Sequence, residues 1–320
     1  MDHKKPIMLS GLPRSGTTWT SDVLKQADDI FYMHEPDNER LYLKTLLLKD
    51  EVHRYPYLKK GQEAPLYHKL WKDLFESHSY AEMFPSKYEV NAYEIEETLG
   101  KKSGEVHDSF FKFTDESAKD KTLKKRIDHR VKPPNKRLFI KSIYNMLALD
   151  WLEEQFNCNQ VVIIRHPANV ISSYLKLKFP DSARNIFSQE ALVNDYFGDI
   201  MPEIEKRTDV VEEMAAQIGG IYSVLEKQLE SHPNWILLRH EELCENPVQQ
   251  FKELYGQLGL KWTKEVKKYI VDANEPGKGF KAKRVASEEI QKYKKLLSEE
   301  QISKIREVYE LFGNPFYEQI

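Results

Sequence analysis

Five short segments rich in apolar and β-forming residues recur along the chain, and they constrain the fold more than any other feature. They cover residues 6–9, 30–33, 137–140, 160–164 and 235–238. Segments such as "VVIIR" show no alternation of polar and apolar residues, which is typical of strands covered on both faces. Helical patterns follow or separate most of them. The sequence therefore predicts an α/β fold, a P-loop-like three-layer sandwich with a central, mainly parallel sheet.

Six segments show helical patterns. They cover residues 18–27, 147–156, 169–178, 210–230, 248–258 and 299–312. In the last segment the apolar residues lie three and four positions apart, which places them on one face of a helix. The chain has 320 residues, of which 40% are hydrophobic, and this size and composition predict a single domain over residues 1–320.

Residues 37–135 interrupt the regular pattern. Short helical pieces, many tyrosines and dispersed charges predict an irregular, helical insertion that caps the sheet. The insertion ends in a basic run, residues 119–137. We interpret this run as a solvated loop, and binding of an anionic substrate is the alternative.

Charge and cysteine content exclude several classes of protein. The formal net charge is -3, from 48 basic and 51 acidic residues, so nothing drives the whole chain toward nucleic acid or an anionic membrane. Its two cysteines, Cys158 and Cys244, are too few for a disulfide framework and lack metal-ligand spacing. The N-terminus lacks an apolar signal core. We therefore expect a cytoplasmic protein without a metal site, and nothing in the sequence indicates its oligomeric state.

Residues 11–19, "GLPRSGTTW", follow the first predicted strand and open the first predicted helix. Gly11 and Gly16 allow a tight turn that directs backbone N–H groups and the positive end of the helix dipole toward an anion. Thr17 stands where the nucleotide loop G-x-x-x-x-G-K-S/T has its lysine, which argues against triphosphate chemistry. Arg14 offers instead a planar set of donors that suits a phosphate. The alternative is a tight strand-to-helix turn without a ligand.

Two motifs together carry a family resemblance. "GLPRSGTTW" resembles the 5′-phosphosulfate loop of sulfotransferases that use 3′-phosphoadenosine 5′-phosphosulfate, PAPS. "VVIIRHPANVISSY" resembles their second motif, in which Arg165 and Ser173 would hold the 3′-phosphate. "WILLRHEELCENPVQQFKELYGQLGL" is similar to a later strand and helix of the family. The resemblance covers roughly residues 6–36, 137–178 and 235–260, and it is poor in the insertion.

The resemblance implies roles for further residues. Lys141 would lie beside the reacting sulfonate, and Arg14 would neutralise the departing phosphate. Tyr222 would stack on adenine or, alternatively, fill the helical core. A basic segment, 276–284, would close over the 3′-phosphate. The cofactor-binding residues expected in this way are Arg14, Ser15, Gly16, Thr17, Thr18, Trp19, Arg165, Ser173, Tyr222, Lys278, Gly279 and Arg284.

The catalytic base departs from the cytosolic members of the family, which place a histidine where this chain has Ile143. Golgi-type and several bacterial members are more similar, with an arginine in the loop and a glutamate after the second strand. Here "FYMHEP" offers Glu35 as the base, with His34 as its rival. We expect their strand to lie beside the first, with only one of the two side chains directed into the site. The alternative is a solvent-facing turn.

The resemblance predicts an enzyme that moves a sulfuryl group from PAPS to a hydroxyl or amine of a small or medium-sized acceptor. Adenosine 3′,5′-bisphosphate would be released, and no metal would be needed. A kinase-like phosphotransferase and a non-catalytic nucleotide-binding protein are the alternatives. The tyrosine-rich insertion does not separate alcohol, phenol, sugar and amine acceptors.

Overall fold

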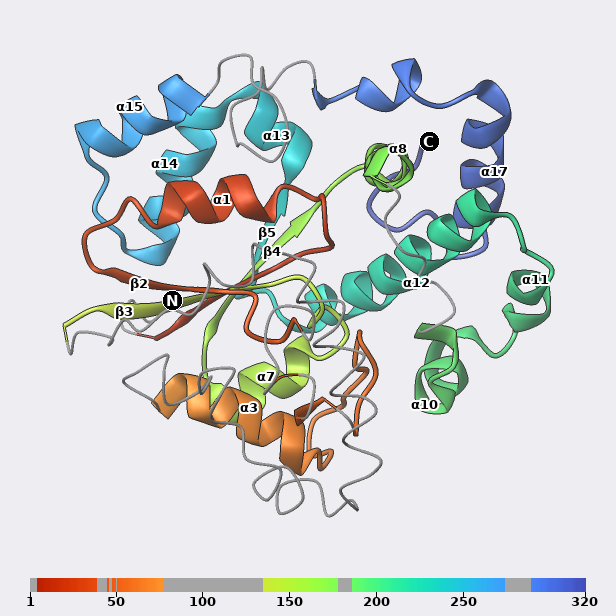
Figure 1. Ribbon diagram of the computed structural model, residues 1–320, viewed down its shortest axis with the longest axis horizontal. Helices are drawn as coiled ribbons and strands as arrows, with labels where there is room; N and C mark the ends of the chain where they lie inside the picture. Colours follow the sequence, from red (N-terminus) through yellow and green to blue (C-terminus); the bar gives the residue numbers. More distant parts are fainter. Residues whose placement is uncertain are drawn as a thin grey trace, which may run out of the picture.

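The computed structural model describes residues 5–38, 45, 48–49, 51–76, 135–177, 186–273 and 289–320. Its centre is a parallel five-stranded sheet with the order β2-β3-β1-β4-β5 (Figure 1). The strands are β1 (Ile7–Ser10), β2 (Ile30–His34), β3 (Arg137–Ser142), β4 (Asn159–Ile164) and β5 (Ile236–Arg239). All five predicted strands are confirmed, with small shifts at their ends.

Helices cover both faces of the sheet, because alternate strand residues point in opposite directions. Ile7 and Val161 pack on one face, in the core cluster that includes α1 (Thr17–Leu24), α14 (Pro247–Leu258) and α15 (Lys264–Ala273). Met8 and Ile140 pack on the other, with α3 (Pro65–Glu76) and α7 (Leu149–Phe156). Figure 1 shows α1, α14 and α15 on one side of the sheet and α3 and α7 on the other. The predicted α/β fold with a parallel sheet between helices is confirmed.

A third core cluster forms beside β4. It joins α8 (Pro167–Leu177), α12 (Val210–Ser231) and α17 (Glu299–Glu310). Capping boxes at Asp209 and Ser298 define where α12 and α17 begin. The remaining elements are α10 (Glu190–Leu192), η2 (Val193–Phe197), α11 (Met201–Glu205), α13 (His240–Glu245) and η3 (Lys292–Lys295). All six predicted helices are present. α3 lies in the segment 37–135, where the sequence predicts short helical pieces, whereas α15 and the short elements were not predicted.

The described part of the predicted capping insertion includes a regular helix. Its helix α3 packs Trp71 and Leu74 with Trp151 of α7 and with Phe31 of β2, so it covers a face of the sheet. The helix is amphipathic, and its apolar side is buried where the sheet offers an apolar face. Residues 77–134, which include most of the basic run, lie outside the described residues.

The expected place of the second strand was wrong. β3 lies between β1 and β2, and it pairs in parallel with both. The chain that leaves β1 enters α1 on one face, and the chain that leaves β3 leads to α7 on the other. Adjacent strands whose following segments diverge in this way are typical of the ligand-binding edge of an α/β sheet.

Two helical glycines give a matched test of the packing between α12 and α17. A Cβ at Gly219 would lie 2.5 Å from the Phe312 ring, whereas a Cβ at Gly256 in α14 would have no neighbour within 4 Å. We expect Gly219→Ala to lower the free energy of unfolding by about 1–3 kcal/mol through overpacking. Gly256→Ala is expected to raise it by about 0.5–1 kcal/mol through helix propensity. Urea denaturation of both variants measures the two effects, and stabilisation by both would contradict the close packing.

Candidate functional site

The loop between β1 and α1 needs glycine at two positions. A Cβ at Gly11 would lie 2.6 Å from the Ile163 side chain, and a Cβ at Gly16 would lie 2.4 Å from the His240 ring. Gly16 also has φ of 104°. The Ser15 hydroxyl donates to the Leu12 carbonyl at 2.7 Å and closes the turn. The loop is therefore compact, with its backbone held close to β4 and α13.

No side chain of the loop caps the backbone N–H groups in the first turn of α1. Gly16 precedes Thr17 as the N-cap of α1 and supplies no side-chain hydrogen bond. Arg14 has φ of 69°, in the left-handed region that non-glycine residues rarely adopt. Such conformations concentrate at functional sites. The start of α1 thus lacks a side-chain cap among the described residues, and anion binding there stays a prediction.

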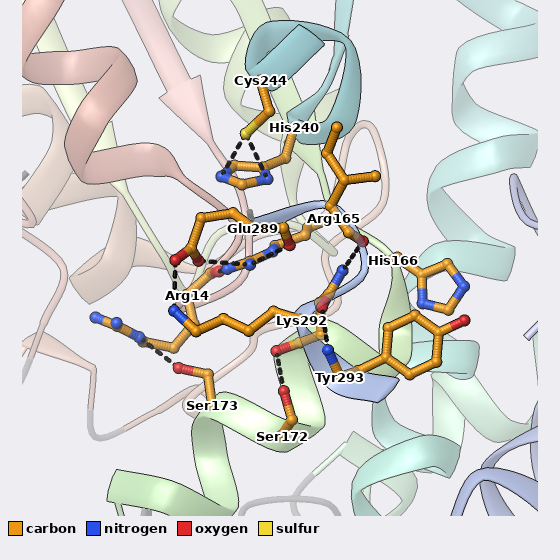
Figure 2. Close-up of polar contacts among 12 residues, drawn as sticks. Arg14, Arg165, His166, Ser172, Ser173, His240, Cys244, Glu289, Lys292 and Tyr293 are labelled. Atoms are coloured by element: carbon orange, nitrogen blue, oxygen red, sulfur yellow. Dashed lines mark hydrogen bonds and ion pairs between the residues drawn. The ribbon is translucent and has the colours of Figure 1, made fainter. Parts of the chain in front are cut away.

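Arg14, Arg165 and Ser173 form one connected cluster. Arg14 Nε donates to Ser173 Oγ at 2.9 Å, and Arg165 Nη1 donates to the Arg14 carbonyl at 3.0 Å (Figure 2). Ser173 lies on α8, and Arg165 lies just before that helix. Arg14 therefore connects the two residues that the sequence predicts to hold the 3′-phosphate, and that shared role stays a prediction.

The Tyr222 ring is fully buried. Its hydroxyl donates to the Arg165 carbonyl and accepts from the Arg165 N–H, both at 3.0 Å. This ring has no exposed face for an adenine, so the core alternative describes Tyr222, and its contact fixes the Arg165 backbone. Trp19 is partly exposed and packs edge-on against Phe251 at 5.2 Å. Lys278, Gly279 and Arg284 lie outside the described residues.

The Arg165 guanidinium contacts a carboxylate that the sequence did not indicate. Arg165 Nη2 lies 3.1 Å from Glu289 Oε2, and Lys292 forms an ion pair with Oε1 of the same carboxylate. Figure 2 shows Arg165 and Lys292 reaching Glu289 from different elements. Glu289 follows a stretch of mixed charge and precedes several lysines, so no motif distinguishes it from a solvated residue.

A second buried ion pair lies at the ends of β2 and β3. Lys141 Nζ donates to Glu35 Oε1 at 2.6 Å and to Thr18 Oγ1 at 3.2 Å. The Asn38 side chain donates to Glu35 Oε2 at 2.8 Å. Lys141 is 1% exposed and Glu35 is 8% exposed, so the solvent-facing turn considered for Glu35 is wrong. One ammonium thus joins the first turn of α1 to the carboxylate.

The expectation that His34 and Glu35 point to opposite sides was also wrong. β2 ends at His34, and Glu35 has φ of 45°, which breaks the alternation of the strand. His34 Nε2 therefore lies 3.8 Å from Glu35 Oε1. His34 Nδ1 forms a 2.8 Å hydrogen bond with the Tyr32 hydroxyl, a contact that the sequence did not predict. Both candidate bases lie in one cluster with Lys141.

Opposing effects set the protonation of Glu35. Burial raises its pKa, but the positive charge of Lys141, the nearby His34 and the hydrogen bonds from Lys141 and Asn38 together lower it further. The net pKa lies below the ordinary value. Glu35 is therefore a carboxylate at neutral pH and is able to accept a proton.

The described part of the chain shows neither a metal-ligand cluster nor a membrane-spanning helix. Within it, no group of three or more His, Cys, Asp and Glu side chains has the arrangement to hold a metal ion. The helices of the same residues include none with the length and apolarity needed to cross a membrane.

Comparison with known proteins gives a family match over most of the chain. The profile of the Sulfotransferase family matches residues 6–264. A search of curated proteins found no match.

Several solved structures are similar to this chain. The sulfotransferase domain from the curacin biosynthetic pathway shares 14% identity, with 99% of both chains covered and a TM-score of 0.46. Mouse sulfotransferase SULT7A1, solved with PAP, shares 12% identity over 97% of this chain and 84% of that chain, with a TM-score of 0.42. Sulfotransferase STF9 from Mycobacterium avium shares 14% identity over 100% of this chain and 79% of that chain, with a TM-score of 0.43.

The Lys141–Glu35 pair predicts a specific dependence of stability on pH. The lowered folded-state pKa of Glu35 means that its contribution is complete above the unfolded value, near 4.5, and is lost as the pH falls through the folded value. At pH 7, Glu35→Gln is expected to lower the free energy of unfolding by about 3–5 kcal/mol, because Lys141 stays buried without its counter-charge. This loss is expected to shrink as the pH falls through the lowered folded-state pKa, where wild-type Glu35 also becomes neutral.

The control is the double variant Glu35→Gln, Lys141→Met, which removes both buried charges. It is expected to be more stable at pH 7 than Glu35→Gln alone. Urea denaturation at a series of pH values gives both comparisons. A loss that stays constant with pH, or that grows in the double variant, would show that the ion pair does not stabilise the fold.

Proposed function

This chain belongs to the sulfotransferase family, and we propose that it transfers a sulfuryl group from PAPS to a hydroxyl or amine of a small or medium-sized acceptor. Adenosine 3′,5′-bisphosphate is the second product. The observation that carries the proposal is the Lys141 ammonium, which bonds both to Thr18 in the first turn of α1 and to the Glu35 carboxylate. It joins the group expected to hold the donor to the group expected to accept the proton.

The donor is bound along the edge formed by β1 and β4. The N–H groups of the loop and the first turn of α1 bind the 5′-phosphosulfate. Arg14 neutralises the bridging oxygen, which gains charge as its bond to sulfur breaks. Arg165 and Ser173 bind the 3′-phosphate. Arg14 holds the two residues near each other, because it contacts both of them. A 3′-phosphate is absent from ATP, so this second cation site favours PAPS over a triphosphate donor.

Transfer forms one bond to sulfur and breaks another. The acceptor oxygen or nitrogen attacks the sulfur, and the S–O bond to the 5′-phosphate breaks, with its electron pair leaving on the phosphate oxygen. Glu35 takes the acceptor proton, since it is ionised at neutral pH. Lys141 lies beside the transferred group and offsets its negative charge. No redox step is involved, and the acceptor proton is the one proton to be moved.

Glu35 is the proposed base, and His34 is the alternative. Glu35 is buried between Lys141 and Asn38, whereas the His34 side chain is 34% exposed and contacts Tyr32. Burial and fixed hydrogen bonds orient a base for one acceptor position. The class of acceptor and a cytoplasmic location stay predictions, as does the part that Lys278, Gly279 and Arg284 play at the 3′-phosphate.

Thermal stabilisation of the protein by added nucleotides tests whether the site binds a PAPS-type nucleotide or ATP. Adenosine 3′,5′-bisphosphate at about 100 times its dissociation constant is expected to stabilise the fold by about 2.7 kcal/mol. Thermal unfolding monitors the shift, and Arg165→Met, which removes the cation for the 3′-phosphate, is expected to abolish most of it. Stabilisation by ATP with magnesium, but not by adenosine 3′,5′-bisphosphate, would contradict the proposal and support a phosphotransferase.

Turnover identifies the base. Glu35→Gln is expected to lower kcat by about 10²–10⁴-fold, because no base then takes the proton from the attacking hydroxyl or amine in the transition state. Nucleotide affinity is expected to stay near that of the wild type. Radiolabelled sulfate transfer to a panel of alcohols, phenols, sugars and amines first finds an acceptor, and then gives kcat for each variant. His34→Gln is the matched variant, and a larger loss there than in Glu35→Gln would assign the base to His34.

A further inference from the structure

The Arg165 guanidinium is already bonded to groups of the protein itself. It is 6% exposed. Its Nη1 donates to the Arg14 carbonyl at 3.0 Å, and its Nη2 donates to both the backbone oxygen and Oε2 of Glu289, at 3.3 and 3.1 Å. A buried cation without a counter-charge is costly. Glu289 therefore supplies the negative charge that Arg165 needs when no nucleotide is bound.

One donor of the same guanidinium lacks a partner among the described residues. Arg165 Nε is buried and makes no hydrogen bond there. In an arginine side chain, Nε and Nη2 lie along one edge of the planar group, and this edge binds two oxygens of a phosphate side by side. Here Glu289 Oε2 occupies only the Nη2 half of that edge. A phosphate that replaced this oxygen would also satisfy Nε.

Glu289 has a second cation to keep it in place. Its Oε1 forms an ion pair with Lys292, one turn further along the chain at the start of η3. The Lys292 side chain is 34% exposed, whereas that of Arg165 is 8% exposed. Figure 2 shows the Glu289 carboxylate between these two cations. Loss of the Arg165 contact therefore leaves Glu289 paired with a cation that is nearer to solvent.

We propose that Glu289 is a positioning residue that occupies Arg165 in the empty enzyme and yields Nη2 to the 3′-phosphate when nucleotide binds. This inference rests on the proposed function, since it requires a nucleotide with a 3′-phosphate. No covalent bond changes in the exchange. The Glu289 carboxylate leaves Arg165 and keeps its ion pair with Lys292, and the phosphate takes both Nε and Nη2 of Arg165.

The exchange has a consequence for turnover. An internal carboxylate that competes for Arg165 weakens the binding of every 3′-phosphorylated nucleotide, including the product. The carboxylate also pairs with the Arg165 guanidinium again as the nucleotide product leaves, and this competition speeds dissociation of the product. Product release limits turnover in many enzymes. Glu289 thus lowers the affinity for the nucleotide, speeds release of the product and stabilises the site when no nucleotide is bound.

The test compares Glu289→Gln with the wild type for binding of adenosine 3′,5′-bisphosphate. The variant keeps the shape of the side chain and lacks its charge. We expect the unliganded variant to unfold at a lower temperature, because Arg165 loses its counter-charge, and yet to bind the nucleotide about tenfold more tightly, with slower dissociation. Calorimetry and stopped-flow displacement measure the two binding quantities. Adenosine 5′-monophosphate is the matched ligand, and its affinity is expected to stay unchanged.

Lys292→Met tests the other half of the exchange and also serves if Glu289→Gln does not fold. Without Lys292, the Glu289 carboxylate lacks the exposed cation that competes with Arg165 for it, so adenosine 3′,5′-bisphosphate is expected to bind more weakly than in the wild type. In the Glu289→Gln background the same substitution is expected to have no further effect on affinity. This double variant excludes a direct contact of Lys292 with the nucleotide.

The outcomes separate the two proposals. Weaker binding of adenosine 3′,5′-bisphosphate by Glu289→Gln, or unchanged binding, overturns the exchange and makes Glu289 a purely structural partner of Arg165. If Glu289→Gln does not fold, wild-type affinity in Lys292→Met overturns it instead. Failure of the wild-type protein to bind this nucleotide overturns the proposed function itself.

Discussion

The ion pair between Lys141 and Glu35 is the interaction on which the rest of the site depends. It is buried at the carboxyl ends of β2 and β3, and the same ammonium reaches Thr18 in the first turn of α1. Neither charge is tolerated there alone, because a buried ion without a partner is strongly destabilising. The pair therefore fixes the loop between β1 and α1 relative to the carboxylate, and it holds the pKa of Glu35 below its ordinary value, so that Glu35 is ionised at neutral pH.

Arg165 is a second buried cation, at the end of β4, and the Glu289 carboxylate supplies its counter-charge. The two pairs differ in what surrounds them. Glu35 is held by Lys141 and by Asn38, so it is fixed in position. Glu289 is shared with the more exposed Lys292, and Arg165 Nε beside it has no hydrogen-bond partner among the residues that the structure describes. The Lys141–Glu35 pair is thus fixed, and in our proposal the Arg165–Glu289 pair opens when nucleotide binds.

The sequence predicts the parts of this protein that depend on local patterns. Apolar runs such as "VVIIR" and helical periodicity located the five strands and six of the helices, and the two motifs directed attention to Arg14, Lys141 and Arg165. The order of strands in the sheet left no such signal, so β2 was expected beside β1. The contact between Arg14 and Ser173 was not predicted either. The positive φ of Glu35 was equally hidden, because that conformation is usually signalled by glycine or asparagine. Glu289 belongs to no motif, and only its contact with Arg165 distinguishes it from a surface residue.

The stoichiometry of the reaction tests the central claim most directly. The protein is incubated with PAPS labelled in its sulfate and with an excess of an accepted hydroxyl or amine compound, and both products are counted over time. Sulfuryl transfer predicts one adenosine 3′,5′-bisphosphate for each labelled acceptor, at a rate that rises with acceptor concentration until it saturates. Release of adenosine 3′,5′-bisphosphate without a labelled acceptor, or no consumption of PAPS with any acceptor class, would contradict it.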